Sequence, residues 1–156
     1  MKSPAADLFQ GLEGSWSGEC STWFEPNVLA DESPISGRFS PAFGGNFLRH
    51  VYDSAMQGKP RNGEETLVFN PGKNKLEATW IDTFHMSAGV LFSEGDLSDN
   101  GFSVFGFYDY APGKPRWGWR TLYELLSSDQ LRITSFNVIP EGEEAKAVEI
   151  HYRRSN

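Results

Sequence analysis

Turn signals recur at short intervals along almost the whole chain, and they constrain the fold more than any other feature. Clusters of Gly, Pro, Asn, Ser and Asp interrupt the sequence at residues 25–27, 43–46, 57–60, 70–74, 99–101, 111–115, 127–129 and 140–143. Gly and Asn accept positive φ and Pro presets the geometry of a turn, so each cluster ends one extended segment and begins the next. Short β-branched and aromatic segments at this spacing predict a β-sandwich or barrel and argue against β-α-β units.

The segments between these turns alternate with the period of two that a half-buried strand requires. Residues 76–84 place on one face Leu76, Ala78, Trp80, Asp82 and Phe84. Residues 116–125 do the same with Trp117, Trp119, Thr121, Tyr123 and Leu125. Segment 102–108 is apolar on both faces, which predicts that its outer side is covered or forms a contact.

The number of these segments predicts a closed barrel. We expect about ten strands, mostly joined by hairpins, and a sheet of that size does not easily stay open and flat. Closure removes the exposed edges and gives an all-β, antiparallel, up-and-down barrel. Pro4, Gly11 and Gly14 favour one short helix before it. We therefore predict a single domain over residues 1–156, with the helix in 1–12 and the barrel in 13–154.

Charge and cysteine content exclude several kinds of partner. Fourteen Lys and Arg against 21 Asp and Glu give a net charge of −7, which repels nucleic-acid backbones and anionic membranes. Cys20 is the only cysteine, so no internal disulfide can form. The sequence shows neither a signal-peptide pattern nor a membrane-spanning apolar run. We expect a cytoplasmic protein, monomeric or homodimeric, with no nucleic-acid and no membrane partner.

A family resemblance begins in residues 12–19, where Gly14-Ser15-Trp16-Ser17-Gly18 gives a Gly-x-Trp pattern followed by a second Gly. This pattern resembles the first strand of calycin barrels, the superfamily of lipocalins and fatty-acid-binding proteins. The later segments that extend the likeness are Phe43-Gly44-Gly45-Asn46-Phe47-Leu48, Met56-Gln57-Gly58-Lys59-Pro60, Phe69-Asn70-Pro71 and Thr79-Trp80-Ile81-Asp82-Thr83. Their succession resembles the bacterial family called domain of unknown function 1579. The resemblance implies a calycin-like barrel and brings no reaction or catalytic residue.

The same first strand also resembles that of nitrobindins, a group of haem-binding barrels. Gly14, Trp16 and Gly18 match their Gly-x-Trp-x-Gly-x-Gly pattern, but Cys20 replaces the last Gly. Nitrobindins bind haem through a histidine near the C-terminus, where this chain has His151. Because the residues flanking His151 differ from theirs, we predict no cofactor. A haem barrel with His151 or His85 as axial ligand is kept as an alternative.

Four residues are predicted to have structural roles, namely Gly14, Trp16, Gly18 and Arg153. Trp16 is expected to plug the closed end of the barrel. In calycins an Arg late in the chain lies over this Trp, and the resemblance implies that Arg153 or Arg154 does so here. A guanidinium over an indole ring contributes about 0.5–2 kcal/mol.

The leading hypothesis is a non-catalytic barrel that binds a small hydrophobic or amphipathic molecule. Barrels of eight or more strands can enclose one small ligand, and aromatic side chains suit the wall of such a cavity. The sequence has no nucleophile elbow, phosphate-binding loop or dinucleotide fingerprint. The candidate ligand-binding residues are Trp80, Asp82, Tyr108, Trp117, Trp119, Arg120 and Tyr123.

An enzyme of the isomerase, cyclase or decarboxylase kind is the alternative. Asp82 shares a strand face with Trp80 and is expected to point inward, and His85 follows at a turn. A His supported by a carboxylate is a competent general base, with Tyr108 and Arg120 as further candidates, although the pair could instead only tie two strands together. The three histidines, His50, His85 and His151, lack metal-ligand spacing, so no metal site is predicted.

Overall fold

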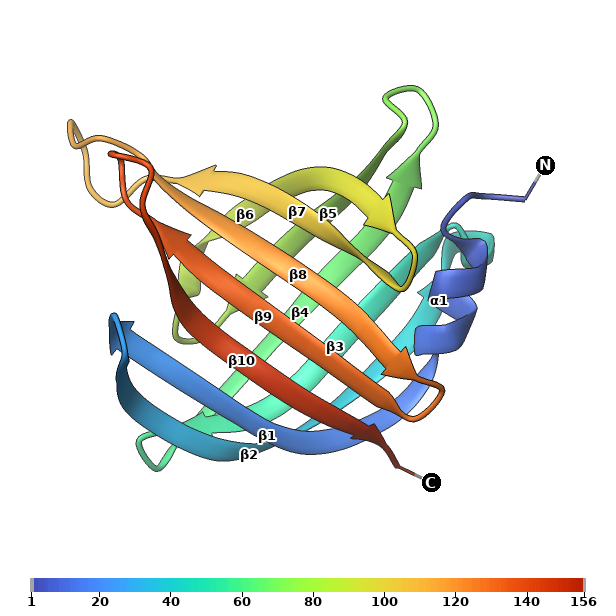
Figure 1. The fold of residues 1–156 in the computed structure, drawn as a ribbon, viewed down its shortest axis with the longest axis horizontal. Helices are drawn as coiled ribbons and strands as arrows, with labels where there is room; N and C mark the ends of the chain where they lie inside the picture. The colour runs from blue at the N-terminus through green and yellow to red at the C-terminus, as the bar shows by residue number, and fades with distance from the viewer. Residues whose placement is uncertain (1, 156) are drawn as a thin grey trace.

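Ten antiparallel strands close into one barrel, which confirms the predicted fold class. The computed structural model describes residues 2–155, and the strands pair in chain order until β10 pairs with β1 (Figure 1). A short 3-10 turn, Phe43–Gly45, lies between β2 and β3. The other elements are α1 Ala6–Leu12, β1 Gly14–Glu25, β2 Val28–Ala42, β3 Phe47–Met56, β4 Lys59–Asn70, β5 Lys75–Asp82, β6 Met86–Ser98, β7 Gly101–Tyr108, β8 Trp117–Ser127, β9 Gln130–Val138 and β10 Glu144–Arg154.

The up-and-down order gives the barrel two ends of different character. The helix end carries α1, the start of β1 and the connections that follow the even-numbered strands β2, β4, β6 and β8 (Figure 1). The opposite end, which we call the mouth, carries the connections that follow β1, β3, β5, β7 and β9. No helix within residues 2–155 is long and apolar enough to cross a membrane.

Helix α1 and the first strand plug the helix end. Phe9 and Leu12 on α1 are buried in the core. Trp16 on β1 is 1% exposed, and its indole Nε1 donates a hydrogen bond of 2.8 Å to the carbonyl of Leu12. The buried tryptophan therefore ties the last turn of the helix to the barrel wall, as expected of a plug.

The cation over Trp16 is Arg154, one of the two arginines that the resemblance implied, and the predicted structural role of Arg153 is corrected. The Arg154 guanidinium lies 4.3 Å from the Trp16 ring centroid. Its Nη atoms donate to the carbonyls of Gly11 and Glu13, both at 2.6 Å, and so satisfy groups that the end of α1 leaves free. Side chains alternate along β10, so Arg153 points outward when its neighbours point inward.

Two glycines of the first strand are required by geometry. Gly14 has φ of +115°, which lets the chain turn from α1 into β1. At Gly18 a Cβ atom would lie 1.7 Å from the carbonyl oxygen of His151 on β10. Because that contact is with backbone, a side chain at Gly18 would push β1 and β10 apart where the barrel closes.

Apolar side chains fill the half of the barrel next to the helix. The strands that enter this half contribute inward-facing residues near the helix end of the barrel. The largest of these are at most 1% exposed, namely Trp16, Phe39, Leu48, Leu67, Leu76, Phe102 and Leu131. Such close packing fills the interior of the described barrel at this end, so any internal site lies toward the mouth.

The outer face of β7, the strand that is apolar on both faces, is partly covered by neighbouring side chains. Phe105 and Phe107 point outward, with ring centroids 5.0 Å apart. Phe105 packs where Gly118 on β8 has no side chain, and Arg116 lies over Phe107 at 4.5 Å from the ring centroid. Phe107 still remains 52% exposed.

Candidate functional site

A belt of buried polar side chains crosses the middle of the barrel. His50 on β3 is fully buried, and its Nδ1 lies 2.8 Å from the Glu65 carboxylate on β4. Its Nε2 lies 2.9 Å from the hydroxyl of Tyr152. Tyr123 donates to the same Glu65 oxygen at 2.5 Å. Burial, followed by the nearby Glu65 charge, raises the pKa of Tyr123 well above its ordinary value, so the phenol keeps the proton that it donates.

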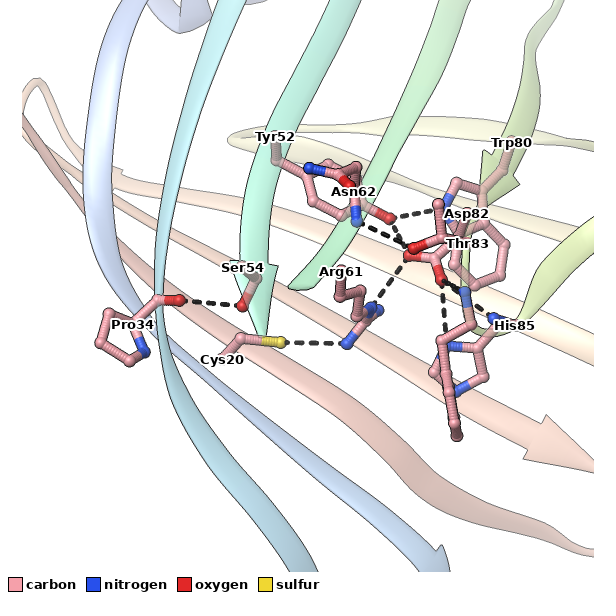
Figure 2. Close-up of polar contacts among 11 residues, drawn as sticks. Cys20, Pro34, Tyr52, Ser54, Arg61, Asn62, Trp80, Asp82, Thr83 and His85 are labelled. Carbon is pink, nitrogen blue, oxygen red and sulfur yellow. Dashed lines mark hydrogen bonds and ion pairs between the residues drawn. The ribbon is translucent and has the colours of Figure 1, made fainter. Parts of the chain in front are cut away.

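A buried ion pair continues this belt toward the mouth. Arg61 and Asp82 are 2% and 3% exposed, and Nε of Arg61 lies 3.0 Å from Oδ2 of Asp82 (Figure 2). The Tyr52 hydroxyl donates to the same oxygen and accepts from Nε1 of Trp80 at 2.9 Å. Nη1 of Arg61 is 3.6 Å from the sulfur of Cys20, a thiol whose pKa is raised by burial. Each buried charge thus has its partner close by, as burial demands.

Asp82 also fixes the loop that follows β5. Its Oδ1 accepts the backbone N–H groups of Phe84 at 2.7 Å and of His85 at 2.9 Å. Burial alone would raise the pKa of Asp82, but Arg61 and the hydrogen bonds from Tyr52 and these two N–H groups hold it below its ordinary value. The carboxylate is therefore charged at neutral pH and holds the loop against the barrel (Figure 2).

His85 lies at the inner edge of this loop. Burial, and then the positive charge of Arg61, lower its pKa from 6.5 to about 4, so the imidazole is neutral at neutral pH. Its Nδ1 is buried without a hydrogen-bond partner in the described structure and is 3.9 Å from Oδ1 of Asp82. That distance is too long for a hydrogen bond. The two side chains that sequence analysis paired are near neighbours, joined through the His85 backbone.

A pocket of about 210 Å³ opens at the mouth above the ion pair. Aromatic rings form most of its wall, and the lining residues are Trp23, Phe24, Trp80, Phe84, His85, Met86, Leu91, Tyr108, Trp119, Asn137 and Ala147. We call this the mouth pocket. It is smaller than the roughly 300–1,000 Å³ of sites that hold drug-sized molecules. Its size therefore fits a molecule of one or two rings, or the ring portion of a larger one.

Two stacked ring pairs organise the mouth pocket. Trp80 and Trp119 stack with centroids 5.2 Å apart and planes at 23°. Phe24 and Phe84 stack nearer the solvent, 5.7 Å apart at 25°. The His85 ring touches both pairs, at 4.8 Å from Phe84 and 5.3 Å from Trp119. The side chain with the lowered pKa is thus enclosed by aromatic rings.

The tryptophan pair separates the mouth pocket from a smaller internal space. This inner cavity of about 30 Å³ is lined by polar groups of the belt, among them Arg61, Glu65 and Thr121, as well as by both tryptophans. Its size and polar lining suit a single water molecule. The larger space for a ligand is therefore on the mouth side of Trp80 and Trp119.

A larger groove lies on the outside of the wall. The β5–β6 ladder is interrupted between the pairs Trp80–Leu91 and Asp82–Met86, so residues 87–90 bow outward. The groove beside them has a volume of about 730 Å³, is open to solvent, and shares only Met86 with the lining of the mouth pocket. It is less enclosed than the mouth pocket, and no aromatic ring other than that of Tyr52 is among its lining residues.

The predicted ligand-binding residues divide into three groups. Trp80, Tyr108 and Trp119 line the mouth pocket. Asp82 lies behind its wall in the ion pair, and Tyr123 is fully buried in the central belt.

Trp117 and Arg120 lie elsewhere, which corrects their placement in the cavity wall. Trp117 stacks on the exposed Tyr110 beyond the pocket. Arg120 points outward, with two hydrogen bonds of 2.8 and 3.0 Å to Glu144 and its guanidinium 4.3 Å from the Phe136 ring centroid. The reason is alternation along β8, which puts Arg120 outside because Trp119 and Thr121 are inside.

Several residues of the mouth pocket are not among those predicted from the sequence. Asn137 on β9 is the register partner of Trp119, and its Oδ1 accepts a hydrogen bond of 2.6 Å from Tyr108. Phe24 comes from the mouth end of β1 and Phe84 from the connection between β5 and β6. The alternation on β9, with Leu131, Ile133, Ser135 and Asn137 on one face, is the signal that could have found Asn137.

The two remaining histidines, His50 and His151, lie in different environments. His50 belongs to the internal belt, while His151 is on the outer wall, where Nε2 lies 2.5 Å from Glu149. An outward His151 does not fit the axial ligand of a haem inside the barrel. Within residues 2–155 no three His, Cys, Asp or Glu side chains come together as a set that could hold a metal ion.

The fold and pocket define a closed ten-stranded barrel of the calycin-like kind, plugged at one end and open to a small aromatic pocket at the other. The family model described as "Protein of unknown function (DUF1579)" matches residues 3–154, and the chain belongs to that family. The family resemblance that the sequence motifs indicate is thereby confirmed.

Solved structures show the same architecture at low sequence identity. Rv2717c from M. tuberculosis has a TM-score of 0.68 at 16% identity, with 100% of both chains covered. The S-type phycobiliprotein lyase CPES from Guillardia theta has a TM-score of 0.66 at 11% identity, covering 99% of this chain and 94% of its own. A de novo designed fluorescence-activating β-barrel reaches 0.51 at 12% identity, covering 99% of this chain and 100% of its own. Curated proteins give no match. These likenesses concern the fold.

Proposed function

We propose that this protein binds a small, largely apolar molecule in the mouth pocket. The observation that carries the proposal is the pocket itself: an aromatic-lined space of about 210 Å³ in an otherwise filled barrel. Burying apolar ligand surface there contributes about 25 cal/mol per Å². A phycobiliprotein lyase and a designed fluorescence-activating barrel among the similar structures are consistent with a functional interior in barrels of this kind.

The contacts of Asp82 favour binding over acid–base catalysis. Both oxygens of this carboxylate already accept hydrogen bonds, from Tyr52 and Arg61 on one side and from two backbone N–H groups on the other. Asp82 does not reach Nδ1 of His85. Asp82 therefore does not support the imidazole of His85 as the carboxylate partner of a general base would, and it orients instead the loop that forms one side of the pocket.

Titration with naphthalene, an uncharged apolar probe, tests the proposal by NMR. We expect the wild-type protein to bind with a dissociation constant of roughly 10 µM to 1 mM, given the affinity of small ligands per atom. Ala147→Leu adds bulk inside the pocket and should abolish binding. Ala6→Leu, the same change on α1 at the helix end, should leave it intact. Equal binding by both variants, or none by the wild type, would contradict the proposal.

A further inference from the structure

The mouth pocket also limits the chemistry of its ligand, an inference that rests on the proposed function. Seven of its 11 lining residues carry aromatic rings, counting His85. Ring pairs in proteins prefer offset-stacked or edge-to-face contacts, and this pocket already holds both, in the stacked Trp80–Trp119 pair and the edge-to-face Phe84–His85 pair. A flat ring can extend these contacts, whereas a puckered aliphatic molecule meets the same walls with fewer close contacts.

Two residues that carry N–H groups, Trp119 and Asn137, lie opposite each other on one wall of the mouth pocket. Trp119 and Asn137 are directly opposed in the β8–β9 register, where inward side chains start about 5 Å apart. Trp119 is 4% exposed and its Nε1 has no hydrogen-bond partner in the described structure. Because the Asn137 oxygen accepts from Tyr108, its NH₂ group remains as a donor. Buried donors without a partner are costly, so a bound acceptor would be favoured here.

The residues that line the mouth pocket supply no formal charge to balance a charged ligand. Of the described residues that line the mouth pocket, none is Lys, Arg, Asp or Glu, and His85 is neutral near pH 7. The nearest buried cation, Arg61, is neutralised by Asp82. A carboxylate or ammonium group would lose its hydration without gaining a partner.

We propose that the ligand is a planar, uncharged aromatic molecule whose carbonyl oxygen or ring nitrogen accepts hydrogen bonds from the indole N–H of Trp119 and the amide of Asn137. The aromatic walls select flatness, the paired donors select an acceptor, and the lack of charge selects neutrality. Nδ1 of His85 lies on the Asp82 side of the ring, 3.9 Å from Oδ1 of that residue, and takes no part in this recognition.

Three matched probes test these features by NMR titration near neutral pH. Naphthalene has two rings and no acceptor, quinoline has the same shape with a neutral ring nitrogen, and 2-naphthoate carries an anion. The quantity measured is the ratio of quinoline to naphthalene affinity. Trp119→Phe keeps a ring but removes the N–H group, so the ratio should fall about 3- to 10-fold, the range of one hydrogen bond.

Two further variants keep the test independent of folding defects. Asn137→Leu preserves side-chain size and should lower the same ratio. Trp117→Phe makes the identical Trp-to-Phe change outside the pocket and should leave the ratio unchanged. Wild-type protein should bind 2-naphthoate at least about tenfold more weakly than quinoline, because the anion has no cation to pair with.

The outcomes separate the two proposals. If no probe binds to the wild type, the proposed function fails. If naphthalene and quinoline bind but both pocket variants keep the wild-type ratio, binding stands and the paired-donor recognition is overturned. If 2-naphthoate binds more tightly than quinoline, the neutrality of the ligand is overturned.

Discussion

The two halves of this barrel are built from the same ten strands but filled in opposite ways. At the helix end, Trp16, Leu67 and Phe102 interlock under α1, with exposures of 1% or less. At the mouth, aromatic side chains stand around a space of about 210 Å³. Each strand contributes to both halves, so the difference comes from side chains rather than backbone. One end of a barrel can thus be filled by side chains while the other end holds an open pocket.

The polar belt between the halves explains how the division is kept. Glu65 and His50 face the filled half, and Arg61 and Asp82 face the mouth. A buried polar group is costly unless it has a hydrogen-bond partner. The belt therefore fixes the positions of the side chains on both sides of it. Burying the polar belt costs desolvation free energy, and its hydrogen bonds require one specific geometry. Substitutions in the belt are therefore expected to have the largest effects.

Arg61→Met should have the largest effect on stability. The change leaves Asp82 buried without its cation, and losing one member of a buried pair costs about 3–5 kcal/mol. Arg120→Met, the same substitution in the outward pair with Glu144, should cost less than about 1 kcal/mol. Denaturant unfolding measures both values. Similar costs would mean that the belt does not divide the barrel.

Leucine truncation compares the two halves directly. Leu67→Ala opens a void in the filled half and should cost about 3–4 kcal/mol of unfolding free energy. Leu91→Ala borders a space that already exists and should cost about 2 kcal/mol. If Leu91→Ala lost more unfolding free energy than Leu67→Ala in the same denaturation experiment, the difference between the two halves would be contradicted.

The pH dependence of stability should report on His85. Because folding lowers its pKa from 6.5 to about 4, the unfolded chain binds the extra proton first as pH falls. This residue therefore makes the fold progressively less stable from pH 6.5 down to about 4, by up to about 3 kcal/mol in total. His85→Phe should flatten the curve of unfolding free energy in that window. A variant curve parallel to the wild type would refute the buried neutral imidazole.

The smallest expected effect concerns the plug. Arg154→Met removes the guanidinium from Trp16 and from the carbonyls at the end of α1, and should lower stability by about 1–2 kcal/mol. Arg153→Met changes an outward residue and should be close to neutral. Thermal unfolding of the two variants distinguishes them, and the reverse order would assign the role to Arg153, the other arginine that the family resemblance implied.

The fold could be predicted from sequence because its signals are local. Turn residues such as Asn70–Asn74 and the alternation through Trp80 and Asp82 act over a few positions, and ten such segments leave few closed arrangements. Alternation also identified Trp80 and Trp119 as inward. The same rule, applied strictly, places Arg120 outside, because it lies between two inward neighbours.

The site depends on pairings that no local signal carries. Asn137 meets Trp119 only through the β8–β9 register, and Arg61 meets Asp82 across the β4–β5 region, 21 residues apart. The Phe24–Phe84 stack joins the end of β1 to the β5–β6 connection, which approach each other only when the barrel closes. Sequence therefore gives the candidate side chains, while closure decides which of them meet.

The most direct test of a filled helix end and a binding mouth is a map of quinoline binding on backbone ¹H–¹⁵N amide resonances. We predict saturable shifts confined to residues around the mouth pocket, such as Phe24, His85, Trp119 and Asn137, with the amides beside Leu67 and Phe102 unmoved. Shifts centred on the helix end or on the outer groove near Val90, or no shifts at all, would contradict the account.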